Sequence, residues 1–304
     1  MSKILVVFGA TGQQGSSVVS YVKERMSDRF KIRAITRDPY KPEAKALEES
    51  GVEVVKADLG DKQSIKQAFK GADTIFAMTA VSFGGQTELE QGKIIADAAV
   101  EEKVPNIIWS TLPSANEISN GEFTHVVHFD EKAEVEKYIR SLPINSSFFS
   151  PGCFMQNFAT SLKPQPVGDG KYTMFNVMRP ASEFPFFDTD DTGKFVGAIL
   201  NEPEKFHGKI LYAATDLYSY EVIARIISKD TGKNVNYQQI PANAFREQIP
   251  KPIAEEITEM FQYVDKYNHY GSETREKVEW GKQQVSEKLT TLEEYFKRNP
   301  LGLE

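Results

Sequence analysis

The first half of the chain alternates short apolar runs, rich in β-branched residues, with longer amphipathic stretches. Strands that alternate with helices typically form a parallel sheet with helices on its faces. The pattern therefore predicts an α/β fold built on a doubly wound, Rossmann-type sheet. The predicted strands are Ile4–Phe8, Ile32–Thr36, Val52–Lys56, Thr74–Ala77, Asn106–Ser110 and Asn145–Ser150, and the predicted helices are Ser16–Met26, Pro42–Glu49, Lys62–Phe69, Gln86–Glu102 and Thr124–Ser141.

The alternation stops after Pro151, where prolines and glycines interrupt residues 163–170. We predict a Rossmann domain over residues 1–152 and a smaller α+β lobe over residues 153–304, part of whose chain returns to the sheet. The lobe is expected to cover the substrate side of the sheet. Its predicted elements are strands at Lys171–Phe175 and Lys209–Ala213 and helices at Thr189–Leu200 and Ser219–Thr231, followed by a mostly helical remainder.

The composition indicates the compartment in which the protein is expected and argues against two classes of partner. Cys153 is the only cysteine among 304 residues, so no intramolecular disulfide can form and a reducing compartment is expected. No leader-peptide pattern and no apolar run of bilayer length is visible, which predicts a cytoplasmic protein, with the nucleus also open, and no membrane contact. A net charge of −7 without a block of basic residues argues against direct binding of nucleic acid.

Three glycines follow the first predicted strand directly and precede the first predicted helix. They lie in the segment Gly9-Ala10-Thr11-Gly12-Gln13-Gln14-Gly15. Gly9 permits a tight exit from the strand, Gly12 allows the backbone to approach a diphosphate, and Gly15 allows the helix to pack against the sheet. The N–H groups at the start of the helix attract an anion. In this strand–turn–helix context the motif predicts a dinucleotide cofactor.

The end of the second strand indicates which dinucleotide is bound. An NAD-selective site typically has an acidic residue there, whereas this chain has Arg37. A guanidinium pairs with a 2′-phosphate, which favours NADP(H). Asp38 is either a ribose ligand or a turn-forming residue before Pro39, and we favour the turn.

Later strands end in further candidate cofactor contacts. Asp58 and Leu59 follow the third strand and border the expected adenine pocket, where Asp58 either bonds the adenine amino group or caps the helix near Asp61. Met78 and Thr79 follow the fourth strand and are expected to border the middle of the cofactor.

Lys132 lies on an unexpected face of its predicted helix. Steps of three and four residues place it on one stripe with His128, Val135, Ile139 and Leu142, and the apolar members mark that stripe as the buried face. A buried lysine needs an anionic or hydroxyl partner, which the ribose and nicotinamide end of a dinucleotide would supply. The alternative is a lysine whose ammonium reaches solvent.

These motifs resemble the NmrA-like members of the atypical short-chain dehydrogenase/reductases. The resemblance covers residues 1 to about 160 and implies an NADP-binding Rossmann domain, with Pro151, Gly152 and Phe154 beside the nicotinamide. It also implies that Ser110 or Thr111 occupies the position of a catalytic hydroxyl. The segments that carry it are Gly9–Gly15, Arg37, His128–Glu136 and Pro151–Asn157.

The wider dehydrogenase group uses a Tyr-x-x-x-Lys pair, and here the spacing is kept as His128-x-x-x-Lys132. Because histidine stands in the tyrosine position, the resemblance favours a redox sensor or transcriptional co-regulator that acts through a protein partner. The alternative is an NADPH-dependent reductase of a quinone or another flat apolar acceptor, with His128 as proton donor and Lys132 orienting the ribose or stabilising an oxyanion. Phe154, Phe184, Phe186 and Phe187 are then candidates for an aromatic substrate wall.

Two other kinds of site are not predicted. Cys153 is interpreted as a packed cysteine rather than an oxidation-sensitive thiol. The four histidines lack acidic partners at metal-ligand spacing, so no metal site is expected.

Overall fold

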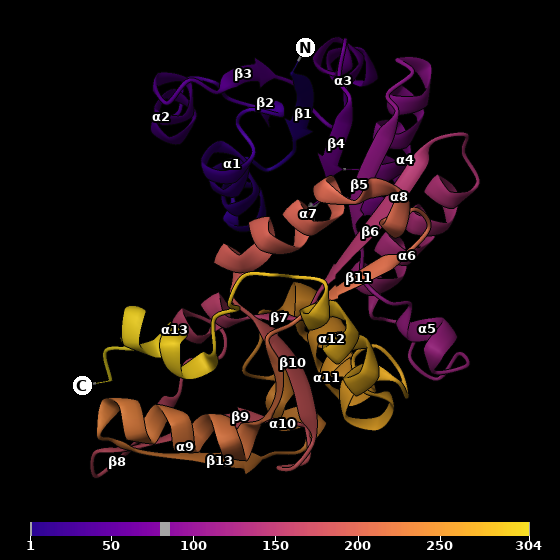
Figure 1. Cartoon of the computed structure of the whole chain (residues 1–304). Helices are drawn as coiled ribbons and strands as arrows, with labels where there is room; N and C mark the ends of the chain where they lie inside the picture. The colour runs from indigo at the N-terminus through magenta and orange to yellow at the C-terminus, as the bar shows by residue number, and fades with distance from the viewer. Residues whose placement is uncertain (1, 80–85, 304) are drawn as a thin grey trace. The chain divides into compact units, whose positions relative to one another are not determined.

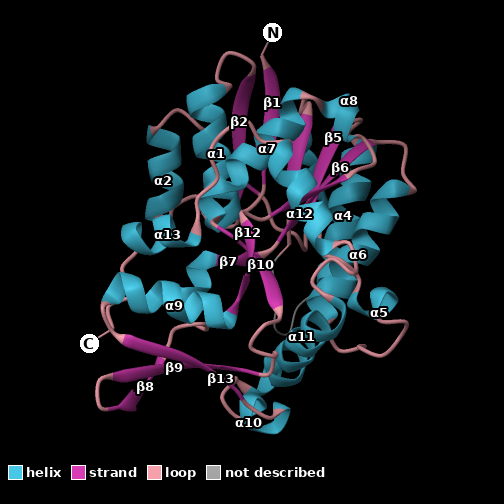
Figure 2. Cartoon of the chain, turned by 60° about the horizontal axis from the view of Figure 1, so that its bottom comes forward, coloured by secondary structure: helices cyan, strands magenta, loops and turns pink. Residues whose placement is uncertain are grey.

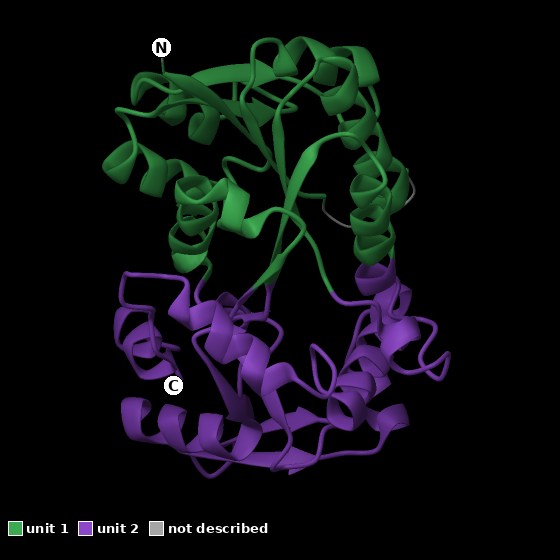
Figure 3. Ribbon diagram, turned by 45° about the vertical axis from the view of Figure 1, so that its right-hand side comes forward, with its two compact units in different colours: residues 1–112, 131–150, 189–211 green, residues 113–130, 151–188, 212–304 purple. Residues whose placement is uncertain are grey.

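The computed structural model describes residues 2–79 and 86–303 (Figure 1). Contacts divide the chain into two compact units (Figure 3). Unit 1 comprises residues 1–112, 131–150 and 189–211, and unit 2 comprises residues 113–130, 151–188 and 212–304. The chain therefore passes between the units several times, and no single cut in the sequence separates them.

A seven-stranded sheet forms the centre of unit 1, in the order β11-β6-β5-β4-β1-β2-β3. Consecutive neighbours from β6 to β3 pair in parallel, which confirms the predicted α/β fold with a Rossmann-type sheet. Among the strands of this sheet, β11 comes last in the sequence, and the second half of the chain contributes it. The bounds are β1 Lys3–Val7, β2 Phe30–Thr36, β3 Glu53–Lys56, β4 Thr74–Ala77, β5 Asn106–Ser110, β6 Asn145–Pro151 and β11 Ile210–Ala213.

The helices of unit 1 pack on this sheet with apolar side chains. Ile65 of α3, Ile95 of α4 and Ile139 of α6 belong to one buried cluster with the strands. The helix bounds are α1 Gln13–Arg25, α2 Pro42–Glu49, α3 Lys62–Phe69, α4 Glu88–Glu101, α6 Val127–Arg140, α7 Thr192–Asn201 and α8 Pro203–Phe206. Helix α6 begins three residues later than predicted and crosses from unit 2 into unit 1 after Asp130.

Helix α1 is held against α7 by close packing, as Figure 1 shows. A β-carbon built on Gly193 would lie 2.4 Å from the Tyr21 β-carbon, and one on Gly197 would lie 2.2 Å from the Tyr21 ring. The Ser17 hydroxyl also accepts a hydrogen bond of 2.9 Å from the Gly193 N–H. These contacts fix the position of the helix that follows the glycine turn.

Unit 2 contains two three-stranded sheets, ordered β12-β10-β7 and β13-β9-β8, together with helices (Figure 2). Residues 163–170, which the sequence suggests form a loop, contribute the exposed strand β8, which pairs with the largely buried strand β9. Strand β10 was not predicted, because its short run contains Pro185, and a proline within a run argues against a strand. The bounds are β7 Cys153–Phe154, β8 Gln165–Gly168, β9 Lys171–Asn176, β10 Glu183–Phe187, β12 Asp216–Ser219, β13 Asn234–Gln239, α5 Ala115–Ile118, α9 Tyr220–Thr231, α10 Ala242–Arg246, α11 Ala254–Tyr267, α12 Thr274–Gln283 and α13 Leu292–Arg298, with short 3-10 turns η1 Met155–Ala159 and η3 Lys251–Ile253 here and η2 Thr189–Asp191 in unit 1.

Candidate functional site

The turn between β1 and α1 is compact because glycines occupy its crowded positions. Gly9 has a φ of +59°, which favours glycine. The Gly12 N–H donates to the Gly9 carbonyl at 2.8 Å and closes the turn. A β-carbon on Gly15 would lie 2.2 Å from the Gly9 carbonyl oxygen, so no larger residue fits there without a shift of the backbone.

The start of α1 is open to an anion. Gly12 is the N-cap and provides no side-chain hydrogen bond, and the first turn contains no acidic residue. The Ser16 N–H makes the first helical bond, to the Gly12 carbonyl, so the preceding N–H groups of the helix have no intrahelical acceptor. Thr11, Gly12 and Gln13 are exposed. Helix starts of this kind, with free N–H groups and a favourable dipole, are suited to binding an anion.

Met78 lies directly against this turn. A β-carbon built on Gly9 would lie 3.1 Å from the Met78 sulfur. Met78 follows β4, which neighbours β1 in the sheet. Met78, which the sequence predicts to border the middle of a cofactor, is therefore adjacent to the glycine turn.

Arg37 follows β2 and is exposed. Among the residues that the structure describes, no hydrogen bond or ion pair engages its guanidinium. Asp38, by contrast, accepts a hydrogen bond of 3.0 Å from the Tyr40 N–H through its carboxylate. Asp38 thus stabilises the turn before Tyr40, which is the role that the sequence favours for it. The guanidinium of Arg37 remains available to a ligand at the end of β2.

The loop after β3 contains Asp58 and Leu59. One carboxylate oxygen of Asp58 accepts from the Gly60 N–H at 2.8 Å. The cap of α3 is Asp61, whose carboxylate accepts from the Gln63 N–H at 3.0 Å. Asp58 therefore does not cap the helix, which rules out one of the two roles considered for it. Leu59 is half-buried against the apolar cluster of unit 1.

The side chain of Lys132 points inward, as its position on the helix predicts, and is only 13% exposed. Its ammonium forms an ion pair with Glu88 and donates to the carbonyl and the hydroxyl of Thr79, both at 3.1 Å. It also lies 5.8 Å from the centre of the Trp109 ring. Burial lowers the pKa of Lys132, and attraction to Glu88 offsets only part of this effect. Lys132 thus does not extend to solvent, and its charge is neutralised inside unit 1.

Glu88 is the partner that the sequence did not reveal. It is the first residue of α4 and only 4% exposed. Its Oε2 accepts from Lys132 and from the Thr79 hydroxyl, whereas Oε1 is buried without a hydrogen-bond partner among the described residues. The Glu131 carboxylate accepts from the Glu88 N–H at 2.8 Å and holds the start of α4. The signal available in the sequence was the capping box of Thr87 and Glu90, which places Glu88 in the first helical turn.

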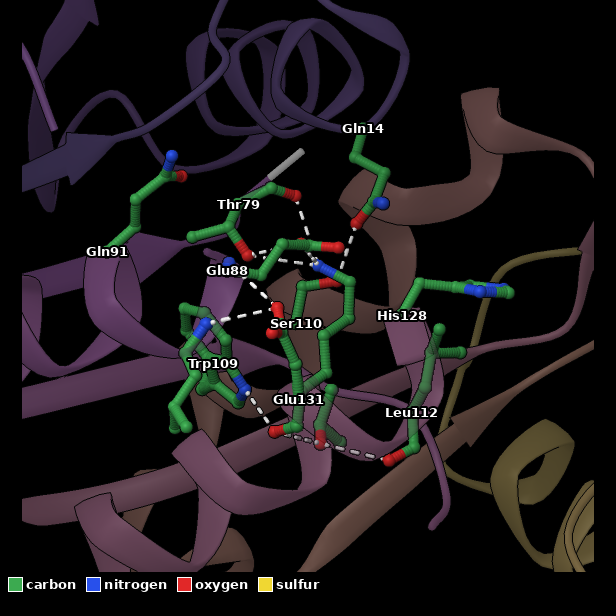
Figure 4. A network of polar contacts seen from close by, with 12 residues as sticks. Gln14, Thr79, Glu88, Gln91, Trp109, Ser110, Leu112, His128 and Glu131 are labelled. Carbon is green, nitrogen blue, oxygen red and sulfur yellow. Dashed lines mark hydrogen bonds and ion pairs between the residues drawn. The ribbon is translucent and has the colours of Figure 1, made fainter. Parts of the chain in front are cut away.

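The two candidate hydroxyls at the end of β5 already have acceptors within unit 1. The Ser110 hydroxyl donates to the Gln14 side chain at 2.9 Å, which ties β5 to the helix after the glycine turn (Figure 4). The Thr111 hydroxyl donates to the Glu136 carboxylate at 2.8 Å. The Thr111 hydroxyl also lies 3.4 Å from the backbone carbonyl of Lys132, and among the described residues neither hydroxyl is hydrogen-bonded to a histidine or lysine side chain.

In unit 2, two glutamates of α11 hold two histidines near the start of α6. Glu256 accepts from the backbone N–H of His128 at 2.8 Å and contacts the ring Nδ1 at 2.5 Å. Glu259 makes the same pair of contacts with His125. Burial acts to raise the pKa of Glu256, but the hydrogen bonds from His128 outweigh it and the pKa is lowered. The imidazole that stands in the tyrosine position is thus fixed by a carboxylate.

The segment after β6 belongs to unit 2 and is closely packed. The Gly152 N–H donates to the Ala213 carbonyl, and a β-carbon on Gly152 would lie 2.5 Å from the Pro185 carbonyl oxygen. Phe154 packs edge-on against Phe187 with ring centres 5.6 Å apart. Pro151 ends β6 and is buried.

Core packing also accounts for the neighbouring aromatic residues and for Cys153. Phe184, Phe186 and Phe187 are at most 2% exposed, so they contribute to the core of unit 2 rather than to an open wall. Burial raises the pKa of the Cys153 thiol to about 12, which suppresses the reactive thiolate. The interpretation of Cys153 as a packed cysteine agrees with this environment.

The part of the chain that the structure describes contains no cluster of three or more histidine, cysteine or acidic side chains arranged to hold a metal ion. None of the described helices combines the length and the apolar character needed to span a bilayer.

Comparisons with known proteins agree with the fold and the motifs. The chain is 31% identical to an NmrA-like family domain-containing protein of Dictyostelium discoideum, over 98% of each chain. Its fold matches the crystal structure of NmrA, a negative transcriptional regulator, in complex with NADP (TM-score 0.79, 22% identity, 99% of this chain and 95% of that one). It also matches the NADPH-dependent quinone oxidoreductase QOR2 of Escherichia coli complexed with NADPH (TM-score 0.79, 20% identity, 97% of this chain and 99% of that one).

The model of the NmrA-like family matches residues 1–296, which is nearly the whole chain. The Rossmann-type sheet, the glycine turn and the extent of this match lead to one conclusion: the chain belongs to the NmrA-like family.

Proposed function

We propose that unit 1 binds NADP(H) and that the chain reports the bound redox form to a protein partner. The observation that carries the binding part is the exposed start of α1, where an uncapped helix end follows a turn with room for a diphosphate. Arg37, at the end of the adjacent strand β2, supplies an unengaged positive charge for the 2′-phosphate.

The residues present fit such a cofactor. Gly12 is exposed at the start of α1, and a β-carbon built on it would meet only the Gly9 carbonyl oxygen, at 3.3 Å, so glycine keeps side-chain atoms away from the helix start that we assign to the diphosphate. On the other side of β1, Glu88 Oε1 offers an acceptor for a hydroxyl-bearing group, next to Lys132 and Thr79, whose donors are engaged with each other and with Glu88. When bound, the nicotinamide ring supplies or accepts a hydride, and the side chains of unit 1 bind and orient the nucleotide.

The engagement of the candidate catalytic groups favours a binding protein over an enzyme. Ser110, Thr111 and Lys132 each have a partner within unit 1, and each would have to give it up to act on a substrate. His128 is likewise held by Glu256 in unit 2. NmrA, which was crystallised with NADP, is a regulator with this fold and supports the same interpretation.

Binding of the cofactor is expected to change how trypsin cleaves the chain. Strand β8 and the turn after it are exposed and lead to the exposed Lys171, which makes the bond after Lys171 the first site to examine. Digestion should differ between the free chain, the chain with saturating NADP and the chain with saturating NADPH. The reason is that a redox sensor must adopt a different conformation in each of these states. Gly12→Ala serves as the control and should not respond. Identical patterns in all three conditions would contradict the sensor proposal.

The second candidate function is reduction of a quinone or a similar flat acceptor by NADPH. The lowered pKa of Lys132 favours it, because a lysine that loses its proton more readily is better suited to proton transfer. The fold shared with the quinone oxidoreductase also supports it. Steady NADPH oxidation with simple quinones that is lost in Lys132→Met and His128→Ala would establish this function, and no turnover across a quinone panel would exclude it.

A further inference from the structure

We propose that Glu88 determines how the nucleotide site discriminates between the oxidised and the reduced nicotinamide. The buried carboxylate supplies a negative charge that favours the oxidised, positively charged ring. This inference rests on the proposed NADP(H) site and adds the residue by which that site distinguishes the two redox forms.

The strand order places Glu88 on the nicotinamide side of the site. Arg37 follows β2 on one side of β1, whereas Thr79 follows β4 on the other side. A dinucleotide whose diphosphate lies at the β1 turn and whose 2′-phosphate meets Arg37 extends its other half toward β4 and β5. Glu88 and Lys132 both contact Thr79, at this second half of the site.

Charge is the property that differs between the two redox forms. The oxidised ring carries a positive charge, whereas the reduced ring is neutral and the phosphates are the same in both. Lys132 alone would therefore disfavour the oxidised form, and a carboxylate beside it cancels that repulsion. Charges act strongly at this place, because Lys132 and Glu88 are both largely buried and water screens them little.

One carboxylate oxygen of Glu88, Oε1, is a buried acceptor that receives no hydrogen bond from the described residues. Its Oε2 serves Lys132 and Thr79, while Oε1 has no partner within the described part of the chain although it is buried. A buried acceptor without a donor is unfavourable, so a ligand that brings a donor gains affinity there. The carboxamide N–H group of nicotinamide and the ribose hydroxyls are such donors.

The other charges around Lys132 do not replace Glu88. Glu131 also attracts Lys132, but its carboxylate is bound to the N–H groups of Glu88 and Leu89 at the start of α4. Among the described residues, the remaining neighbours of the ammonium are the Trp109 ring and the oxygens of Thr79, which are neutral. Glu88 is therefore the carboxylate in direct contact with the lysine.

The test is the ratio of the dissociation constants for NADP⁺ and NADPH, measured by calorimetric titration of the full chain. Glu88→Gln keeps the shape but removes the buried negative charge that favours the oxidised ring, so the ratio should shift toward NADPH by roughly tenfold, or ~1.4 kcal/mol. The matched control is Glu90→Gln, which removes the same charge from an exposed position of the same helical turn and should leave the ratio unchanged.

A double variant separates the charge effect from damage to the fold. Glu88→Gln with Lys132→Met removes both charges, so no buried charge remains unpaired, and the ratio should return most of the way to that of the unaltered chain. A ratio that stays the same in Glu88→Gln while both forms still bind would overturn the inference. Failure of the unaltered chain to bind either form would overturn the proposed function itself and this inference with it.

Discussion

Gly12→Ala loses nucleotide binding and keeps its fold. The backbone φ of Gly12 is −96°, which alanine adopts without strain, and the added methyl group approaches only the Gly9 carbonyl oxygen, at 3.3 Å. The methyl group does, however, stand where a diphosphate must approach the N–H groups of α1. We expect the affinity for NADP to fall at least roughly 100-fold, or ~2.7 kcal/mol. Calorimetric titration and thermal unfolding of the free chain measure the two effects separately.

Gly15→Ala provides the contrast, because its added methyl group points into the protein rather than toward the ligand. The new β-carbon would lie 2.2 Å from the Gly9 carbonyl oxygen and 2.7 Å from that of Phe8. The helix must then move off the sheet, and we expect the free energy of unfolding to drop by roughly 3 kcal/mol. If Gly12→Ala bound NADP as tightly as the unaltered chain, the turn would not be the phosphate site.

Arg37→Glu reverses the preference between NADP and NAD. Arg37 is exposed and without a partner among the described residues, so its replacement should not disturb folding. A glutamate there repels the 2′-phosphate but accepts hydrogen bonds from the 2′- and 3′-hydroxyls of NAD. We expect NADP binding to weaken roughly 100-fold, since a charge-assisted hydrogen bond is replaced by repulsion, while NAD binding stays or improves.

Two further variants complete this test. Lys31→Glu changes the same charge at an exposed position near the opposite end of β2 and should leave the preference unchanged. Asp38→Asn tests the alternative that Asp38 binds the ribose, and we expect a small effect because its carboxylate is used in the turn with Tyr40. Equal loss of NADP and NAD in Arg37→Glu would show that Arg37 does not contact the 2′-phosphate.

The sheet of unit 1 could be predicted because its signals are local. Strands buried on both faces appear as continuous apolar runs, and glycines mark the turn after β1, where a side chain on Gly15 would collide with the backbone. The inward direction of Lys132 was also visible, because helical spacing is set by geometry alone. The predicted Rossmann-type fold and the family resemblance are confirmed.

The contacts of the site could not be predicted, because they join residues far apart in the chain. Lys132 meets Glu88 44 positions earlier, and His128 meets Glu256 128 positions later. No periodicity specifies such pairs, since they depend on how separate helices pack. In unit 2, short strands such as β7 and β12 gain their hydrogen bonds from distant strands, and their own sequences carry little signal.

The most direct measurement is a calorimetric titration of the unaltered chain with NADP⁺, NADPH, NAD⁺ and NADH under the same conditions. We predict one nucleotide per chain, with both phosphorylated forms bound at least roughly tenfold more tightly than their NAD counterparts and with NADP⁺ and NADPH bound unequally. Absence of binding by all four nucleotides would contradict the assignment of the glycine turn as a dinucleotide site. Equal affinity for all four would contradict both the role of Arg37 and the sensing of redox state.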